Sequence, residues 1–261
     1  MTYTVTPVCD QVLLLGDSSQ WGGANIPVFV RLLRSVIEEI NSLVGVHPNE
    51  TLLIQPDLNR GYPECCKLPD GSFLIFLSAR GDTNWGQFVY QFAHEYCHRM
   101  INGPIDGELE TTFWFEESIC EMSSLFLLKR MAEFWDEIQV STEELGILHR
   151  YAPFFSFYPR LLKYPPLITV PLHDWLEANM PIISEPGYHR DLYSQIARVL
   201  FGLFFSYPDL WQMLPFLHRP KPAKYSGFYD FITNTVPSRM TITIEHYPQF
   251  VETLFGQRHE Q

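Results

Sequence analysis

The sequence has few basic residues. Lys and Arg together number 18, against 30 Asp and Glu, so the chain carries a formal net charge of −12 at pH 7. Proteins that hold nucleic acid through its phosphates need a basic face, and no such face is apparent in this sequence. We therefore expect no nucleic-acid partner.

Long hydrophobic runs are also missing. The longest, Val199–Phe205, is far shorter than the roughly 18–20 residues that a membrane-spanning helix needs. The first basic residue is Arg31, and the apolar stretch Val12–Leu15 is too short for the hydrophobic part of an export signal. We expect neither a membrane anchor nor secretion.

Cysteine is scarce and follows no metal-binding or disulfide pattern. The chain has five Cys, an odd number, of which Cys65 and Cys66 are adjacent and the other three are scattered. No CxxC spacing occurs, which excludes a zinc ribbon, and the count argues against a disulfide framework. These features favour a protein of a reducing compartment, and we expect it to be cytoplasmic.

Apolar and aromatic side chains are abundant. The 261 residues are 46% hydrophobic and 15% aromatic, which excludes intrinsic disorder and allows a sizeable core. Of the 20 prolines, 7 lie in residues 1–150 and 13 lie after them, so short helices separated by turns are expected in the later part. The chain divides into residues 1–140 and 141–261, which form either two domains or one continuous domain.

Hydrophobic periodicity predicts an α+β fold. A helix is expected over residues 24–44, strands over Thr51–Gln55 and Ser72–Leu77, a second helix over 84–102, and a third from residue 111 or 112 through Arg130. Pro69-Asp70-Gly71 predicts a turn just before the second strand. The later part is predicted to hold helices around residues 173–178, 192–205 and 210–217.

Residues 94–98 read His-Glu-Tyr-Cys-His, which is the HExxH pattern. On a helix, His94 and His98 are four positions apart and lie on nearly the same face, so both imidazoles can bind one metal ion. Glu95 follows the first of them and can contact a metal-bound water.

A catalytic zinc ion takes three protein ligands and leaves one position open to water. One group of HExxH enzymes uses HExxHxxGxxH, but Ile101 and Pro104 stand at its Gly and last His positions here. Another group uses a Glu from the following helix, and 18 residues, 99–116, separate His98 from Glu117. A shift of one residue would use Glu116 instead, which would face roughly 100° away on the helix.

The HExxH-x18-E spacing resembles the gluzincins, the thermolysin and aminopeptidase branch of the zincin metallopeptidases. The resemblance covers roughly residues 72–124 and implies a zincin-like fold, with a small mixed sheet, an edge strand at Ser72–Leu77 and an α-helical C-terminal part that completes the cleft. It implies His94, His98 and Glu117 as ligands of Zn2+, and Glu121 as the carboxylate that holds a ligand imidazole. The aminopeptidase pattern Asn-Glu-Gly is Glu116-Glu117-Ser118 here, and the GxMEN string is missing, so aminopeptidase activity is not implied.

The resemblance also implies a mechanism, the metal-assisted hydrolysis of a peptide or protein substrate laid along Ser72–Leu77. Glu95 would accept the proton of the water and deliver it to the leaving amine. A Tyr or His downstream of the third ligand would stabilise the oxyanion. The candidates are Tyr193, His189 and Tyr188, and Tyr193 comes first because Tyr193–Ala197 resembles the family's downstream tyrosine helix.

Cys97 and Cys120 stand next to ligand positions at the wrong helical phase, so we expect both to be small buried side chains. The aromatic clusters Phe154–Tyr158 and Phe201–Tyr207 are expected in the core. Two functions fit the pattern. A zinc metallopeptidase is favoured because a purely structural site needs no general base. The alternative is a catalytically silent or latent zincin-fold module that binds a protein or peptide partner.

Overall fold

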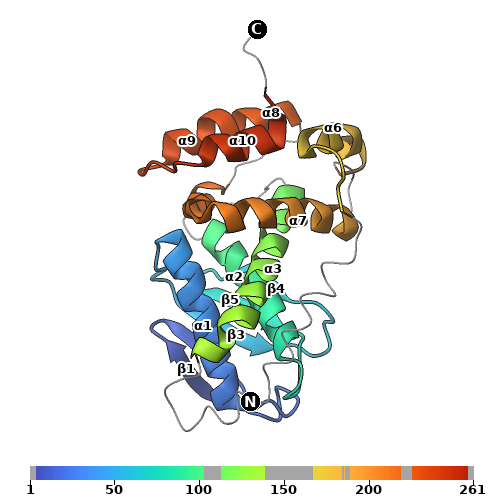
Figure 1. Cartoon of the computed structure of the whole chain (residues 1–261). Coiled ribbons are helices and arrows are strands. Elements are labelled where there is room, and N and C mark those ends of the chain that lie inside the picture. Colours follow the sequence, from blue (N-terminus) through green and yellow to red (C-terminus); the bar gives the residue numbers. More distant parts are fainter. Residues whose placement is uncertain are drawn as a thin grey trace. The chain divides into compact units, whose positions relative to one another are not determined.

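A computed structural model describes residues 4–102, 113–138, 167–183, 185, 189–218 and 225–257. These residues form a mixed α+β structure with a five-stranded mixed sheet, in agreement with the predicted fold class (Figure 1). The chain separates into two compact units, described one at a time below. One takes Met1–Ser42, Val46–Arg99 and Ser123–Lys163, and we call it the sheet unit; the other, the helical unit, takes Leu43–Gly45, Met100–Met122 and Tyr164–Gln261. The predicted boundary near residue 140 lies outside the described residues.

The sheet has the strand order β1-β2-β3-β5-β4. Its strands are β1 (Val5–Cys9), β2 (Val12–Leu15), β3 (Leu52–Pro56), β4 (Glu64–Lys67) and β5 (Phe73–Leu77). Strands β2, β3 and β5 run parallel, whereas β1 and β4 pair antiparallel to their neighbours at the two edges. Leu14, Ile54 and Ile75 stand opposite one another across the three parallel strands and are fully buried. This row fixes the register, because a slip by one residue would turn it away from the core.

The predicted strand Ser72–Leu77 is present as β5, but the prediction that it forms the edge of the sheet is wrong. β5 lies between β3 and β4, so β4 is the edge strand beside it. The predicted turn at Pro69-Asp70-Gly71 closes the β4–β5 hairpin, with Leu68 N donating to Ser72 O at 2.7 Å. The sequence does not predict β4, because the four residues Glu-Cys-Cys-Lys have no alternation of apolar and polar side chains.

The opposite edge, β1, carries a proline. Gly16 N donates to Thr4 O at 2.8 Å, so hydrogen bonding to β2 falls at every second residue from Thr4. Pro7, the third residue after Thr4, therefore directs its backbone nitrogen away from β2, and that nitrogen has no hydrogen to donate. Such a proline hinders the pairing of an edge strand with other chains, because it offers them no N–H.

Two helices of the sheet unit begin in a shared aromatic cluster. These are α1 (Ile26–Val44) and α2 (Trp85–Asn102), both close to their predicted ranges. Trp21 packs edge-on against Phe29 of α1 with ring centroids 4.8 Å apart, and Phe29 lies 4.4 Å from Phe88 of α2. Gly22 at φ 66° allows the Trp21 loop to approach the loop between β5 and α2, since a Cβ there would stand 2.8 Å from the Cβ of Arg80.

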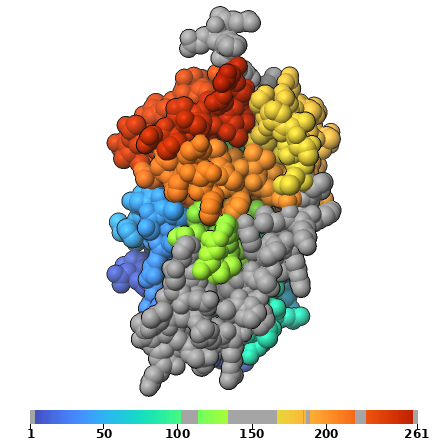
Figure 2. Space-filling model, viewed as in Figure 1, coloured from blue at the N-terminus to red at the C-terminus, as the bar shows by residue number. Residues whose placement is uncertain are grey.

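The helical unit contains the C-terminal elements, and their bounds are α6 (Leu172–Ile183), α7 (Arg190–Ser206), the 3-10 helix η2 (Pro208–Phe216), α8 (Tyr225–Asp230), the π-helical turn η3 (Phe231–Thr235), α9 (Val236–Arg239) and α10 (Tyr247–Phe255). The first three correspond to the predicted helices. Helix α6 packs against α10, and the yellow and red surfaces meet in Figure 2. Gly256, at φ 71°, lies against the His173 ring, where an added Cβ would stand 3.1 Å from it.

Aromatic rings fill the interior of the helical unit. Phe204 of α7 is fully buried and packs edge-on against Trp211 and Phe250, but the prediction that the whole cluster Phe201–Tyr207 lies in the core is wrong, because Phe201 and Tyr207 are only half-buried. Phe205, in contrast, is 42% exposed. The other cluster, Phe154–Tyr158, lies outside the described residues. Within the described part of the chain, no helix has both the length and the hydropathy to cross a membrane.

Candidate metal centre

Helix α2 carries the HExxH residues and is held against the sheet by a buried arginine. Arg99 is 1% exposed, and its guanidinium donates to the backbone carbonyl of Glu50 at 2.5 Å and to the hydroxyl of Tyr96 at 3.3 Å. At the other end of the helix, Gln91 Oε1 accepts hydrogen bonds from the backbone N–H groups of Ser78 and Ala79, just after β5. These bonds fix the rotation of α2, and hence the side on which His94 and His98 stand.

The next helix, α3 (Phe113–Ile138), approaches α2 through two small residues. Ser123 donates to the carbonyl of Ala93 at 3.3 Å, and Ser124 donates to the carbonyl of Tyr90 at 2.8 Å. Ser124 follows Ser123 along α3, but its partner Tyr90 precedes Ala93 along α2. The two helices therefore run antiparallel. Residues before Ser123 are therefore carried toward the C-terminal half of α2, where His98 lies.

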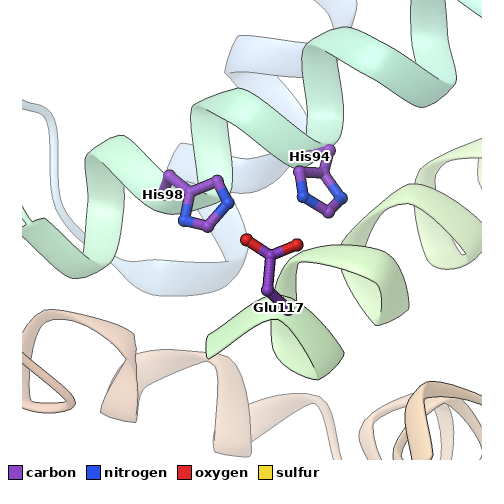
Figure 3. A group of neighbouring side chains, drawn as sticks. All are labelled: His94, His98 and Glu117. Atoms are coloured by element: carbon purple, nitrogen blue, oxygen red, sulfur yellow. The ribbon is translucent and has the colours of Figure 1, made fainter. Parts of the chain in front are cut away.

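Glu117 lies with the two histidines, as the spacing predicts (Figure 3). One nitrogen of His94, one nitrogen of His98 and one carboxylate oxygen of Glu117 all lie within 4.8 Å of one another. Ligands of a tetrahedral zinc ion with bonds near 2.0 Å stand about 3.4 Å apart. Small side-chain rotations would therefore bring the three atoms to one ion, and the residues fit a divalent metal.

Four carboxylates on α2 and α3, that of Glu117 among them, are buried. Glu95 is 4% exposed, Glu116 and Glu117 are each 7% exposed, and Glu121 is 8% exposed. Carboxylates are rarely buried to this degree unless they are paired or coordinate metal. Glu116 does not belong to the group of potential ligands in the described part of the chain, whereas Glu117 does. The predicted role of Glu95 as general base stays a prediction.

Glu121 contacts the helical unit's α7. Its Oε1 accepts a hydrogen bond from the hydroxyl of Ser194 at 3.4 Å, and Ser194 is also 8% exposed. The predicted contact between Glu121 and a ligand imidazole stays a prediction. No sequence pattern singled out Ser194, because its partner lies 73 residues earlier in the chain.

The first oxyanion-donor candidate, Tyr193, is 2% exposed on α7. Burial is the main cause that raises the pKa of its phenol; a backbone hydrogen bond at His189 opposes this effect, and the Glu117 carboxylate adds to it. The phenol therefore keeps its proton and lies within electrostatic range of the predicted third ligand. His189 packs perpendicular to Tyr193, and its buried Nε2 has no hydrogen-bond partner among the described residues. Tyr188 lies outside the described residues.

The edge strand β4 is electrostatically coupled to the HExxH helix. Burial raises the pKa of the Cys66 thiol; the Arg60 guanidinium opposes this, and the Glu95 carboxylate raises it further. Cys66 of β4 is thus near the predicted general base. Cys97 and Cys120 are fully buried, as predicted, and neither belongs to the potential ligand group.

Comparison of the chain with protein-family models, with curated proteins and with solved structures gives no match. The resemblance to the gluzincins therefore depends on the motif residues and their spacing.

Proposed function

We propose that the protein is a zinc-dependent metallopeptidase with a zincin-like catalytic domain. The observation that carries the proposal is the convergence of His94, His98 and Glu117 within 4.8 Å, on helices that also present Glu95. Two imidazoles and one carboxylate are a donor set typical of catalytic zinc. When bound, the metal would polarise the scissile carbonyl and acidify a water.

The chain's own residues would then perform the proton transfers. Glu95 would take a proton from the attacking water and deliver it to the leaving amine. Tyr193, whose phenol carries its proton at neutral pH, would donate a hydrogen bond to the oxyanion that forms during attack. His189, whose buried Nε2 has no hydrogen-bond partner in the part of the chain that the structure describes, is the second candidate for this donor.

A peptide substrate would bind along β4 rather than along β5. The backbone of β5 is hydrogen-bonded on both sides, whereas β4 pairs on one side only within the described sheet. An extended peptide can add to such an edge by backbone pairing. The influence of the Glu95 carboxylate on the pKa of the Cys66 thiol supports the choice, because Glu95 is the proposed general base.

The test compares the wild type with Glu95→Gln. Metal content is measured by mass spectrometry, and turnover is measured on a library of internally quenched peptides. We expect the variant to retain its zinc and to lose about 10²–10⁴-fold in kcat, the usual contribution of a general base. Glu38→Gln, an equal charge change on the exposed side of α1, is the matched control and should leave kcat unchanged.

Zinc bound in both proteins with equally negligible turnover would contradict the peptidase and favour the binding module. A wild type that takes up no metal would contradict both the peptidase and the zincin-fold binding module.

A further inference from the structure

The hydrogen bond between Ser194 and Glu121 joins two helices of the helical unit. Both residues are 8% exposed, and the hydroxyl oxygen stands 3.4 Å from the carboxylate oxygen. This separation is long for a hydroxyl–carboxylate bond. Burial, however, keeps away the water that would compete for the carboxylate, so the hydroxyl has a stronger influence on it than it would have at the surface.

Tyr193 stands next to Ser194 in the sequence of α7. The Glu117 carboxylate contributes to the raised pKa of the Tyr193 phenol, and Glu117 lies four residues, about one helical turn, before Glu121 on α3. The Ser194 hydrogen bond therefore reaches α3 one turn from the candidate third metal ligand and on nearly the same helix face.

The register of α7 is supported elsewhere along its length. Ile196, Ala197, Leu200 and Phe204 are fully buried, and Phe204 packs against Trp211 and Phe250. The helix is therefore held by apolar contacts toward its C-terminal end, while the Ser194 hydroxyl supplies a directional polar contact near its beginning. Of these contacts, only the polar one would orient the Glu121 carboxylate.

We propose that Ser194 is a positioning residue of the metal centre, an inference that rests on the proposed function. Its hydroxyl orients the Glu121 carboxylate, one helical turn from Glu117, and holds the beginning of α7 against α3. Partners that hydrogen-bond directly to a metal ligand typically contribute about 10–100-fold to metal affinity, and Ser194, one hydrogen bond further out, is expected at the lower end of that range. Ser194 thus acts through Glu121 and Tyr193 and does not itself touch a reacting atom.

The experiment measures zinc affinity by competition with a chromophoric chelator, using the full chain. Ser194→Ala should weaken zinc binding by about tenfold, and Ser194→Thr, which keeps the hydroxyl, should restore most of the affinity. Ser206→Ala removes a serine from the exposed end of the same helix and should leave the affinity unchanged. If Ser194→Ala does not fold, Ser194→Cys keeps the size of the side chain with a weaker donor and should also weaken zinc binding.

Peptide turnover gives a second readout. Ser194→Ala should lower kcat more than it raises KM, and the fall in kcat should largely vanish in a Tyr193→Phe background, since the two changes act on one group. Unchanged zinc affinity in Ser194→Ala and Ser194→Cys would overturn the proposal, as would a failure of Thr to restore it. A wild type that binds zinc without cleaving peptides would contradict the peptidase, and the affinity comparison would still decide the role of Ser194.

Discussion

Glu116 and Glu117 are neighbours of the same chemical type and equal exposure, yet they have different surroundings. Both are 7% exposed, and only Glu117 has a carboxylate oxygen within 4.8 Å of the two imidazole nitrogens. One position on a helix turns a side chain by about 100°, so two adjacent carboxylates cannot reach the same ion from the same backbone. This difference makes Glu116 a natural control for Glu117.

We expect Glu117→Gln to weaken zinc binding by at least about 100-fold, because it removes a direct ligand and a charge, a larger change than the loss of an outer partner. Glu116→Gln, with the same change in charge and volume, should alter the affinity less than about tenfold. Chelator competition on both variants measures the ratio. Equal losses in the two variants would show that charge, and not ligation, is responsible.

The grouping of the three candidate ligands could be predicted from sequence because its geometry is local. His94 and His98 share a face through the helical repeat, and Glu117 follows after a connection of fixed length. The neighbours of Tyr193 and Ser194 could not be predicted in the same way. Their partners Glu117 and Glu121 lie more than 70 residues away in the chain, and only the packing of α7 on α3 brings them together.

At the scale of elements, the proposed peptide site on β4 depends on which backbone groups of that strand point away from the sheet. Leu68 N bonds to Ser72 O, so along β4 the backbone groups of Cys66 and Glu64 also point toward β5. Those of Cys65 and Lys67 point away from the sheet. An added peptide strand would meet the N–H of Cys65.

A proline can remove that donor without disturbing the hairpin. Cys65→Pro should lower kcat/KM for peptide substrates by roughly three- to tenfold, the value of one lost hydrogen bond, because the missing N–H faces the substrate side. Cys65→Ala keeps the N–H and should behave as wild type. Cys66→Pro interrupts the β4–β5 ladder and should instead destabilise the protein, as thermal unfolding would show. Full activity in Cys65→Pro would exclude β4 as the peptide-binding strand.

The elements with strong periodicity agree with prediction, and the weak ones do not. The helix expected over 24–44 and the strand over 51–55 appear as α1 and β3, shifted by two residues or fewer. β1, β2 and β4 were not predicted. Each has only four or five residues, and Glu64–Lys67 forms a strand because β5 offers it a partner, an interaction that its own composition does not indicate.

At the scale of the whole molecule, buried tyrosines in both units make the stability of the fold depend on pH in the alkaline range. Burial raises the pKa of Tyr96 in the sheet unit, against the opposing effects of Arg99 and Asn41, and it raises the pKa of Tyr247 in the helical unit. The folded protein therefore holds these phenol protons to a higher pH than the unfolded chain, in which tyrosine has a pKa of about 10. Their contribution to stability is complete below pH 10 and is lost as the pH rises toward the folded pKa values.

We expect the free energy of unfolding to fall above about pH 10, by up to about 1.4 kcal/mol per pH unit for each such tyrosine. Tyr247→Phe should reduce this slope, although it also loses the hydrogen bond from the phenol to the carbonyl of Ile232 at 2.6 Å and will be less stable at neutral pH. Urea titrations between pH 8 and pH 11, followed by circular dichroism, measure the slope. Tyr62→Phe, at a side chain that is 60% exposed, should leave the slope as in the wild type. An unaltered slope in Tyr247→Phe would contradict the assignment.

The two edges of the sheet also bear on how the protein behaves in concentrated solution. Pro7 closes the β1 edge to strand addition, and nothing equivalent stands between Glu64 and Lys67 on β4. If β4 is the peptide-binding strand, as proposed, its backbone would pair with the β4 strand of a second molecule as well as with a substrate. The formal charge of −12 on each molecule opposes such encounters, and salt weakens that opposition. Under that proposal, substrate binding and self-association would compete for the same four residues, and conditions that screen charge would favour self-association.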